Sequence, residues 1–194
     1  MTPLASITTP RLHLRAAEPS LAAAVADFYR RNREAHARWS PPMPEGVFSI
    51  DGQAARLADS ATAAEAGAAI GWWLFAADAP AIALGQIHFS QITRRAFSNT
   101  MLGYAIDAAH EGRGLMREAL AAALADTFGP RVQLHRVQAN VRPENSRSLA
   151  LLARLGFEHE GLARQYLFID GAWRDHVMTA LRNPAWPAVQ APPA

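Results

Sequence analysis

The 194-residue sequence contains no cysteine and no lysine. Without cysteine there is no disulfide framework, no thiolate nucleophile and no metal or iron–sulfur site with cysteine ligands. All 19 basic residues are therefore arginine, and the 17 acidic residues leave a formal net charge of +2. A charge this small does not by itself argue for binding to nucleic acid, so no sequence-specific nucleic-acid partner is expected.

Long apolar runs are also missing. No run approaches the roughly 20 residues that a membrane-spanning helix needs, and the first residues lack the charged, apolar and small-residue order of a secretory signal. A hydrophobic fraction of 50% and a charged fraction of 19% are typical of one soluble domain. We expect a single domain over residues 1–183 in the cytoplasm, without membrane contact, and a Pro/Ala-rich tail over residues 184–194.

The hydrophobic pattern predicts an α+β fold in which strands and helices are mixed. The expected strands cover Arg11–Arg15, Ile70–Ala77, Ala81–Ile92, Asn99–Ile106 and His135–Val141, and a hairpin that turns at Asp170-Gly171 closes the chain. The expected helices cover Ser20–Ala37 with Ser20 as the N-cap, Asp51–Gly67, Leu115–Phe128 and Glu144–Gly156. A turn is expected at Asp78-Ala79-Pro80.

The stretch "AHEGRGLMREALAAALADTFG" joins a predicted strand to a predicted helix through Gly112-Arg113-Gly114. A helix N-terminus carries unpaired N–H groups and a partial positive charge, and glycines before it allow a ligand to approach the backbone closely. This combination suits a pyrophosphate. The alternative is a plain strand-to-helix turn that needs glycine for positive φ. The stretch is neither a P-loop nor a complete Rossmann fingerprint.

Four further segments accompany this turn: "NVRPENSRSLALLARLGFEHEG", "YLFIDGAWRDHVMTAL" and, near the N-terminus, "TTPRLHLR" and "NREAHARWSPP". Together they resemble the GNAT superfamily of N-acetyltransferases, in particular the ribosomal-protein-alanine N-acetyltransferases of the RimJ/RimL type, with RimJ the nearest. The resemblance implies a mostly antiparallel seven-stranded sheet flanked by helices and splayed between its fourth and fifth strands. It also implies acetyl-CoA as cosubstrate and no metal.

The family's pyrophosphate loop reads Gln/Arg-x-x-Gly-x-Gly/Ala and falls here on Glu111–Met116. The resemblance therefore assigns cofactor binding to Gly112, Arg113, Gly114, Leu115 and Met116. Glu111 replaces the usual polar or basic residue, and Met116 replaces the small one. Backbone donors do not depend on side chains, so binding should survive, with Glu111 directed away from the pyrophosphate. Arg113 either adds a charge-assisted contact or is a solvated surface arginine.

In the family the pantetheine arm lies between the splayed strands, which Met101–Ile106 and His135–Val141 match. A backbone N–H near Ile106 would then polarise the acetyl carbonyl as an oxyanion donor. Asn140 lies near the exposed end of the second of these strands. The resemblance adds these residues to the expected cofactor site.

The family's Asn-x-x-Ser motif falls on Asn145 and Ser148. The resemblance places Asn145 beside the pantetheine amides and Ser148 near the sulfur, where its hydroxyl would act on the leaving thiolate. The alternatives are a helix cap for Asn145 and a local backbone bond for Ser148. Many members carry an acidic tyrosine four residues after the serine, but here that position is Leu152, a core residue. Ser148 or water must take that role.

The general base that the family often uses is also missing. A glutamate of the fourth strand is matched by Met101, and a glutamate of the sixth strand by Leu167. The Asp175-His176 pair is expected to fix the final hairpin. The fallback candidates for the base are His88, Glu160 and Asp175, and the alternative for His88, as for His176, is a structural histidine.

The missing base bears on which kind of amine the enzyme can acetylate. Deprotonation at pH 7 costs roughly 1 kcal/mol for an α-amine and about 4.6 kcal/mol for a lysine. A chain without a strong base is therefore easier to reconcile with an N-terminal substrate, and the N-terminal alanine of a ribosomal protein is favoured. The rivals are a small amine, such as an antibiotic, a polyamine or an amino acid, and a non-catalytic module that senses CoA or binds ribosomes.

For two groups of side chains, the sequence leaves both a functional and a structural interpretation open. One group of aromatic residues either lines the acceptor cleft or packs in the core: Trp39, Trp72, Trp73, Tyr166 and Phe168. The arginines of the first predicted helix either bind an acidic or RNA-bearing partner or form a solvated helix face, and the second is favoured: Arg30, Arg31 and Arg33.

Overall fold

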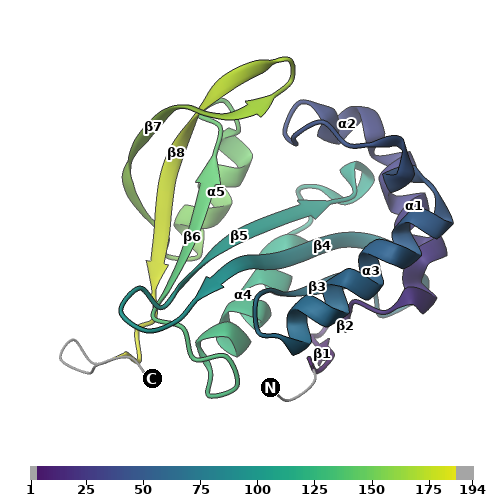
Figure 1. Ribbon diagram of the computed structural model, residues 1–194, viewed down its shortest axis with the longest axis horizontal. Coiled ribbons are helices and arrows are strands. Elements are labelled where there is room, and N and C mark those ends of the chain that lie inside the picture. Colours follow the sequence, from purple (N-terminus) through teal and green to yellow (C-terminus); the bar gives the residue numbers. More distant parts are fainter. Residues whose placement is uncertain (1–3, 187–194) are drawn as a thin grey trace.

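In the computed structural model, which describes residues 4–186, one mixed sheet of eight strands runs through the molecule (Figure 1). Its order is β1-β2-β3-β4-β5-β6-β8-β7. The strands are β1 (Ile7–Thr8), β2 (Leu12–Ala16), β3 (Ile70–Ala76), β4 (Ala79–Thr93), β5 (Asn99–Ile106), β6 (Arg136–Val141), β7 (Glu158–Ile169) and β8 (Ala172–Arg182). The expectation of seven strands missed β1, whose two residues are too few to show an alternating pattern.

Five α-helices accompany the sheet in the described residues: α1 (Ala22–Arg31), α2 (Arg33–Ala37), α3 (Ile50–Glu65), α4 (Leu115–Phe128) and α5 (Ser146–Arg154). Short 3-10 turns cover Pro19–Leu21, Glu45–Phe48 and Ala108–His110. The expectation of one helix from Ser20 to Ala37 was wrong. Ser20 lies inside a 3-10 turn rather than at an N-cap, and the helix is interrupted at Asn32, whose side chain is buried against the end of β5.

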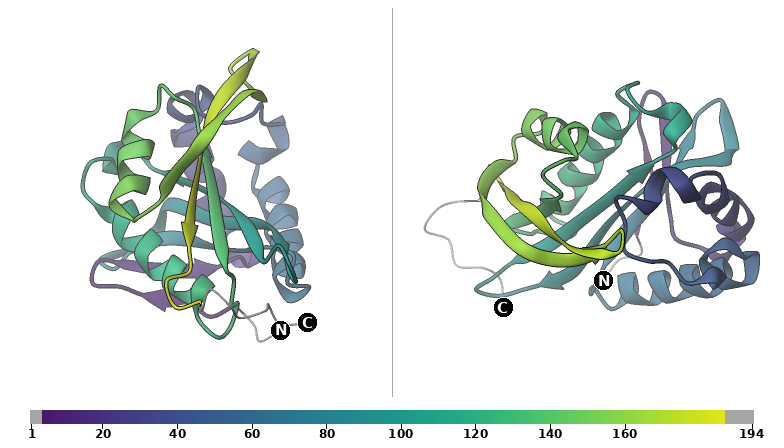
Figure 2. Two further views of the ribbon diagram at one scale, coloured as in Figure 1. Left: turned by 90° about the vertical axis from the view of Figure 1, so that its left-hand side faces the viewer. Right: turned by 90° about the horizontal axis from the view of Figure 1, so that it is seen from above.

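The helices lie on both faces of the sheet. Figure 2 shows α4 and α5 on one side and α1 and α3 on the other. Consecutive residues of β3 point to opposite faces: Trp72 packs in the core under α4, and Trp73 packs in the core under α1 and α3. The two tryptophans are 1% and 8% exposed, so of the two alternatives left open for them, packing in the core is the one observed.

The sheet opens between its fifth and sixth strands. β5 and β6 are parallel, and they pair only from Asn99 to Met101 and from Arg136 to Gln138. Beyond these residues the two strands diverge (Figure 1). The rest of β5, up to Ile106, therefore has a free edge, as the expected splay requires.

The chain reversals differ little from expectation. β3 and β4 are joined at Ala77-Asp78, one residue earlier than expected. The final hairpin turns at Asp170-Gly171, and both residues have positive φ, as a two-residue hairpin turn needs. The predicted tail lies mostly outside the described residues, although the Trp186 ring contacts His135. Within residues 4–186, no helix is long and apolar enough to cross a membrane.

Candidate active site

The glycine turn exposes several unpaired backbone N–H groups at one place on the surface. Gly112 and Gly114 have φ angles of 75° and 74°, and Gly114 is the N-cap of α4. No residue of the described chain accepts a hydrogen bond from the backbone N–H groups of Gly112, Arg113 or Gly114. The first helical N–H groups add to them, because a first turn has no internal acceptor. The turn therefore presents several N–H groups to an anion.

A set of contacts to the N-terminal strands holds this turn in place. The Arg11 guanidinium donates to the carbonyl of Arg113 at 2.9 Å and to the Glu118 carboxylate at 2.7 Å. Thr9 donates its hydroxyl to the same carboxylate at 2.7 Å. Burial alone would raise the pKa of Glu118, but these hydrogen bonds outweigh burial and lower it. The turn is therefore fixed before any ligand arrives.

The side chains of the turn divide between core and solvent. Met116 is 5% exposed and packs in the core with the apolar face of α4, so only its backbone is open to a ligand. Arg113 is exposed, and within residues 4–186 its guanidinium has no partner. Glu111 forms an ion pair with Arg147 of α5, which neutralises the carboxylate next to the turn. The expected repulsion of a pyrophosphate is thus reduced.

The end of β5 presents backbone groups to the splay. Asp107 N–H donates to the Leu84 carbonyl at 2.7 Å, so the neighbouring Ile106 faces the opposite edge of its strand. The Ile106 carbonyl accepts a hydrogen bond from His36 Nε2 at 2.9 Å. The Ile106 N–H shares that orientation. It is therefore available at the free edge, where an oxyanion donor was expected.

A tyrosine that sequence reasoning missed crosses the splay from β5 to α5. The Tyr104 hydroxyl forms a close hydrogen bond with Ser148 Oγ. Burial raises the pKa of Tyr104 to about 12, against the opposing effect of its bond to Ser148. The phenol is therefore protonated at neutral pH and can donate. The missing tyrosine of α5, at the position of the buried Leu152, has a counterpart on the facing strand.

The Asn-x-x-Ser motif has a local structural role. Asn145 is the N-cap of α5, and its side-chain oxygen accepts from the Ser148 backbone N–H at 3.1 Å. This cap sets the first turn of α5 and so directs Ser148 toward Tyr104. On the same side of the splay as α5, Asn140 of β6 donates its side-chain amide to the Tyr166 hydroxyl at 3.0 Å. Asn140, Asn145 and Ser148 therefore lie across the opening from the free edge of β5.

Two of the fallback bases are engaged elsewhere. Glu160 forms an ion pair with Arg136, and Asp175 accepts a hydrogen bond at 2.8 Å from the Gln165 backbone across the final hairpin. His176 is 3% exposed and bonds to the backbone of its own strand, which confirms its structural role. His88 is exposed on β4, and no residue within 4–186 forms a hydrogen bond with its ring.

A cavity of about 430 Å³ lies between the α1–α2 segment and the turn of the final hairpin. Its lining residues are Tyr29, Asn32, Arg33, His36, Ala37, Ser40, Pro41, Pro42, Met43, Phe48, Asp170 and Gly171. Asp170 is the acidic member of this lining, and its carboxylate is 3.3 Å from Arg174. The cavity is mostly apolar and offers space for a small side chain and a short backbone segment.

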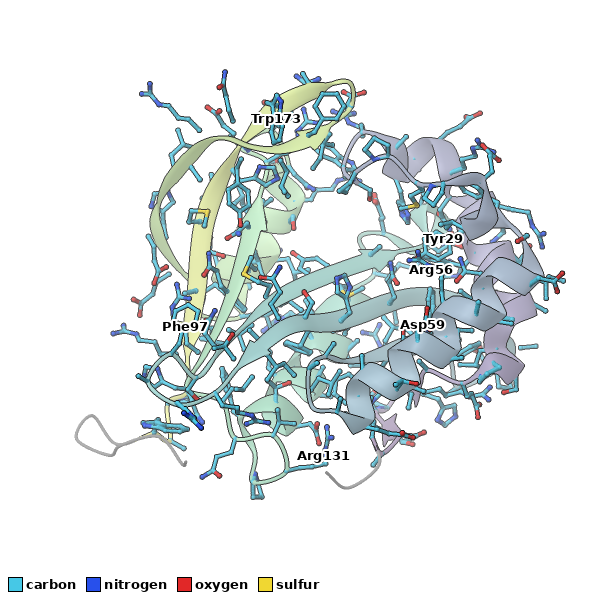
Figure 3. The ribbon with its side chains drawn as sticks, in the orientation of Figure 1. Tyr29, Arg56, Asp59, Phe97, Arg131 and Trp173 are labelled. Carbon is cyan, nitrogen blue, oxygen red and sulfur yellow. The ribbon has the colours of Figure 1, made fainter. Side chains whose placement is uncertain are left out.

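The structure places several of the side chains that the sequence left open. Phe168 is 44% exposed and packs edge-on against Trp173 near the tip of the hairpin, where Figure 3 labels Trp173. Trp39 stacks with the guanidinium groups of Arg38 and Arg142. Arg31 is not simply solvated, because it pairs with Asp107 at 2.8 Å and ties α1 to the end of β5.

The chain matches a protein-family model and is similar to two bacterial enzymes. A family model described as an acetyltransferase (GNAT) domain matches residues 11–158. The ribosomal protein uS5-alanine N-acetyltransferase of Escherichia coli is 43% identical over 185 residues, 95% of this chain and 94% of that protein. Its counterpart from Shigella flexneri gives the same identity and coverage.

Solved structures agree with this relationship. The ribosomal-protein-S5-alanine acetyltransferase of Vibrio fischeri superposes with a TM-score of 0.89 and 31% identity, covering 95% of this chain and all (100%) of that one. RimJ of Mycobacterium smegmatis, solved with a CoA-disulfide, has a TM-score of 0.87 and 28% identity, covering 98% of this chain and 91% of that one.

Proposed function

Because the chain belongs to the GNAT family of acetyltransferases, we propose that it moves an acetyl group from acetyl-CoA to the α-amine of an N-terminal alanine on a ribosomal protein of the uS5 type. The observation that carries this proposal is the 43% identity to the Escherichia coli enzyme over 95% of the chain. Such coverage includes the cofactor turn, the splay and the acceptor side together. The enzyme would work in the cytoplasm, beside the ribosome, with residues 1–183 as its one domain and residues 184–194 as a tail.

The proposed cofactor site is formed by the free backbone N–H groups of the glycine turn. The pyrophosphate lies on the N–H groups from Gly112 to Met116, with Arg113 as a counter-charge. Their unpaired state, and the open space that a Cβ at Gly112 would meet, support this placement. The pantetheine arm then runs into the splay, past Asn140, Asn145 and Ser148, with the acetyl carbonyl at the Ile106 N–H.

The proposed acid is the Tyr104–Ser148 pair. When the amine attacks the acetyl carbon, the carbon–sulfur bond breaks and the sulfur leaves as a thiolate. A phenol that stays protonated at neutral pH can donate its proton to that thiolate, directly or through the Ser148 hydroxyl. The hydrogen bond between the two hydroxyls across the splay supports this role.

The proposed acceptor site is the cavity under the α1–α2 segment. A cationic antibiotic or polyamine would favour a large acidic cleft. Here the acidic lining residue, Asp170, is already paired with Arg174. The apolar lining, which includes Pro41, Pro42 and Met43, suits the first residues of a peptide better than a polycation.

The test is acetylation of the intact acceptor. The uS5 protein is prepared without N-terminal acetylation and incubated with this enzyme and acetyl-CoA, and its N-terminal peptide is read by mass spectrometry. We expect one acetyl group on the α-amine of the first alanine. The same protein with an added N-terminal proline is the control and should stay unmodified. Acetylation at internal lysines alone would overturn the proposal.

A further inference from the structure

The reaction needs a group that takes a proton from the acceptor's ammonium, and neither carboxylate position familiar in the family supplies one. Met101 and Leu167 occupy those positions, and the carboxylates of Glu160 and Asp175 are held by other groups. A base must face the side from which the amine arrives and must have a free lone pair. His88 of β4 meets both requirements.

His88 lies in a space made by two glycines. It is paired with Gly71 of β3 on one side and with Gly103 of β5 on the other. A Cβ built on Gly103 would lie 2.2 Å from Cε1 of the imidazole, so the ring rests directly over this glycine. A larger residue at position 103 would displace the ring. The strand pairing therefore fixes the imidazole above the middle of β5.

That position borders the splay. The pairing of β5 with β6 ends at Met101, two residues before Gly103, so the ring lies where the free edge of β5 begins. Gly103 and Tyr104 are adjacent, and adjacent strand residues point to opposite faces. Tyr104 reaches Ser148 on the side of α5, and His88 lies on the side of α1 and α3. The two groups thus flank the opening from opposite faces.

The acceptor cavity reaches the same strand. The Tyr29 hydroxyl, part of the cavity wall, donates to Gln86 Oε1 at 3.2 Å. Gln86 and His88 share a face of β4, two residues or about 7 Å apart. A residue that contacts the cavity wall and the imidazole are therefore neighbours on one face of β4.

The surroundings of His88 favour the neutral form of its ring. The surrounding protein lowers the pKa of the imidazole by reducing its hydration, and Arg56 of α3 lowers it further. Figure 3 shows Arg56 on α3 and Tyr29 on α1, the helices of this face. The facing residues of β5, Met101 and Gly103, carry no charge. A neutral imidazole has one nitrogen free to accept a proton.

We propose, on the basis of the acetyl transfer proposed above, that His88 is the general base that accepts a proton from the acceptor's ammonium group. The freed amine attacks the acetyl carbon, a C–N bond forms and the C–S bond breaks. The nitrogen loses a second proton to water as it becomes an amide, while Tyr104 gives its proton to the thiolate and regains one from water. His88 then releases its proton to water. Tyr104 and His88 divide acid and base between the two faces of β5.

The experiment compares wild type with His88→Gln, and with His159→Gln as a matched control for an exposed strand histidine outside the site. The acceptor is a peptide with N-terminal alanine, assayed from pH 7 to pH 9.5. For His88→Gln we expect kcat to fall about 100-fold at pH 7. The deficit should shrink above pH ~8, where the α-amine loses its proton unaided. Affinity for acetyl-CoA, measured by calorimetry, should not change, and His159→Gln should match wild type.

A second variant displaces the ring without removing it. Gly103→Ala should lower kcat at pH 7 with the same recovery at high pH. Full activity of His88→Gln at pH 7, an equal deficit at every pH, or a loss of acetyl-CoA affinity would each overturn the role of His88. Should wild type acetylate only a small amine, the proposed acceptor is wrong, and the same pH series on that amine still decides the role of His88.

Discussion

At the residue scale, the cofactor turn depends on Gly114, whose φ of 74° places it where side chains are rarely tolerated. Gly114→Trp adds a bulky group beside the free N–H groups. We expect affinity for acetyl-CoA to become undetectable in calorimetry while the far-UV circular dichroism spectrum stays native. Gly161→Trp is the control, because Gly161 also has positive φ and open space but lies on β7. Tight binding by a folded Gly114→Trp protein would refute the placement of the pyrophosphate.

The Tyr104–Ser148 pair predicts a coupled loss of activity. Tyr104→Phe and Ser148→Ala should each lower kcat by about 10- to 100-fold, since each interrupts proton donation to the thiolate. The double variant should be little worse than either single one, because the two hydroxyls act as a unit. The measurement is kcat at saturating substrates, with acetyl-CoA affinity as a separate readout. Independent, multiplying losses, or losses confined to affinity, would contradict this account.

The sequence predicts a cofactor role for the glycine turn and Ser148, but it indicates no role for Tyr104. A turn motif and a helix cap are local patterns, so their residues lie close together in the chain. Tyr104 and Ser148 are 44 residues apart and meet only because β5 separates from β6 next to α5. Nothing local in "MLGYAI" indicates which side chain crosses that gap. The family resemblance instead points to a tyrosine on the serine's own helix, where this chain has Leu152.

At the element scale, Asp107 joins the end of β5 to α1. Burial raises the pKa of its carboxyl, but hydrogen bonds from Arg31, the Ala109 backbone and Asn32 outweigh burial and lower it. Asp107→Asn should reduce the free energy of unfolding by roughly 2 kcal/mol at pH 7, because it removes the buried carboxylate that binds Arg31 and leaves Arg31 with Asp27 as its carboxylate partner. Urea unfolding measures this loss.

The pH dependence of that loss follows from the lowered pKa. A carboxyl whose pKa is lower in the folded state contributes stability above its unfolded pKa, near 3.9, and loses it as the pH falls further. The gap between wild type and Asp107→Asn should therefore be constant above about pH 5 and shrink below about pH 4. A gap that stays unchanged at acid pH would show that the Asp107 charge is not its source.

The sequence predicted the elements that have a strong hydrophobic periodicity. It did not predict the element boundary that depends on tertiary contacts. The apolar face of α4 recurs every three to four residues and lies in the core as expected. The segment from Ser20 to Ala37 has the composition of one helix but is broken at Asn32. The Asn32 side chain bonds to the Asp107 carboxylate and to the Ala108 N–H, residues remote in sequence. No local pattern predicts this break.

At the scale of the whole molecule, the splay separates the two substrates. The cofactor turn and α5 lie on one face of the sheet, and the acceptor cavity lies with α1 and α2 on the other. Both substrates must be bound together for the amine to meet the acetyl group through the opening. Initial rates at varied acetyl-CoA and peptide should therefore give intersecting double-reciprocal lines. Parallel lines, or an isolable acetyl-enzyme, would indicate a covalent intermediate.

The central claim is that the acceptor is an α-amine. Two peptides are offered with acetyl-CoA at pH 7: one has a free N-terminal alanine and no lysine, and the other has a blocked N-terminus and one lysine. The lysine amine costs about 3.6 kcal/mol more to deprotonate at this pH, which a single neutral histidine does not offset. We predict rapid acetylation of the first peptide and none of the second. Acetylation of the lysine peptide alone, or of neither while a small amine is turned over, would contradict the account.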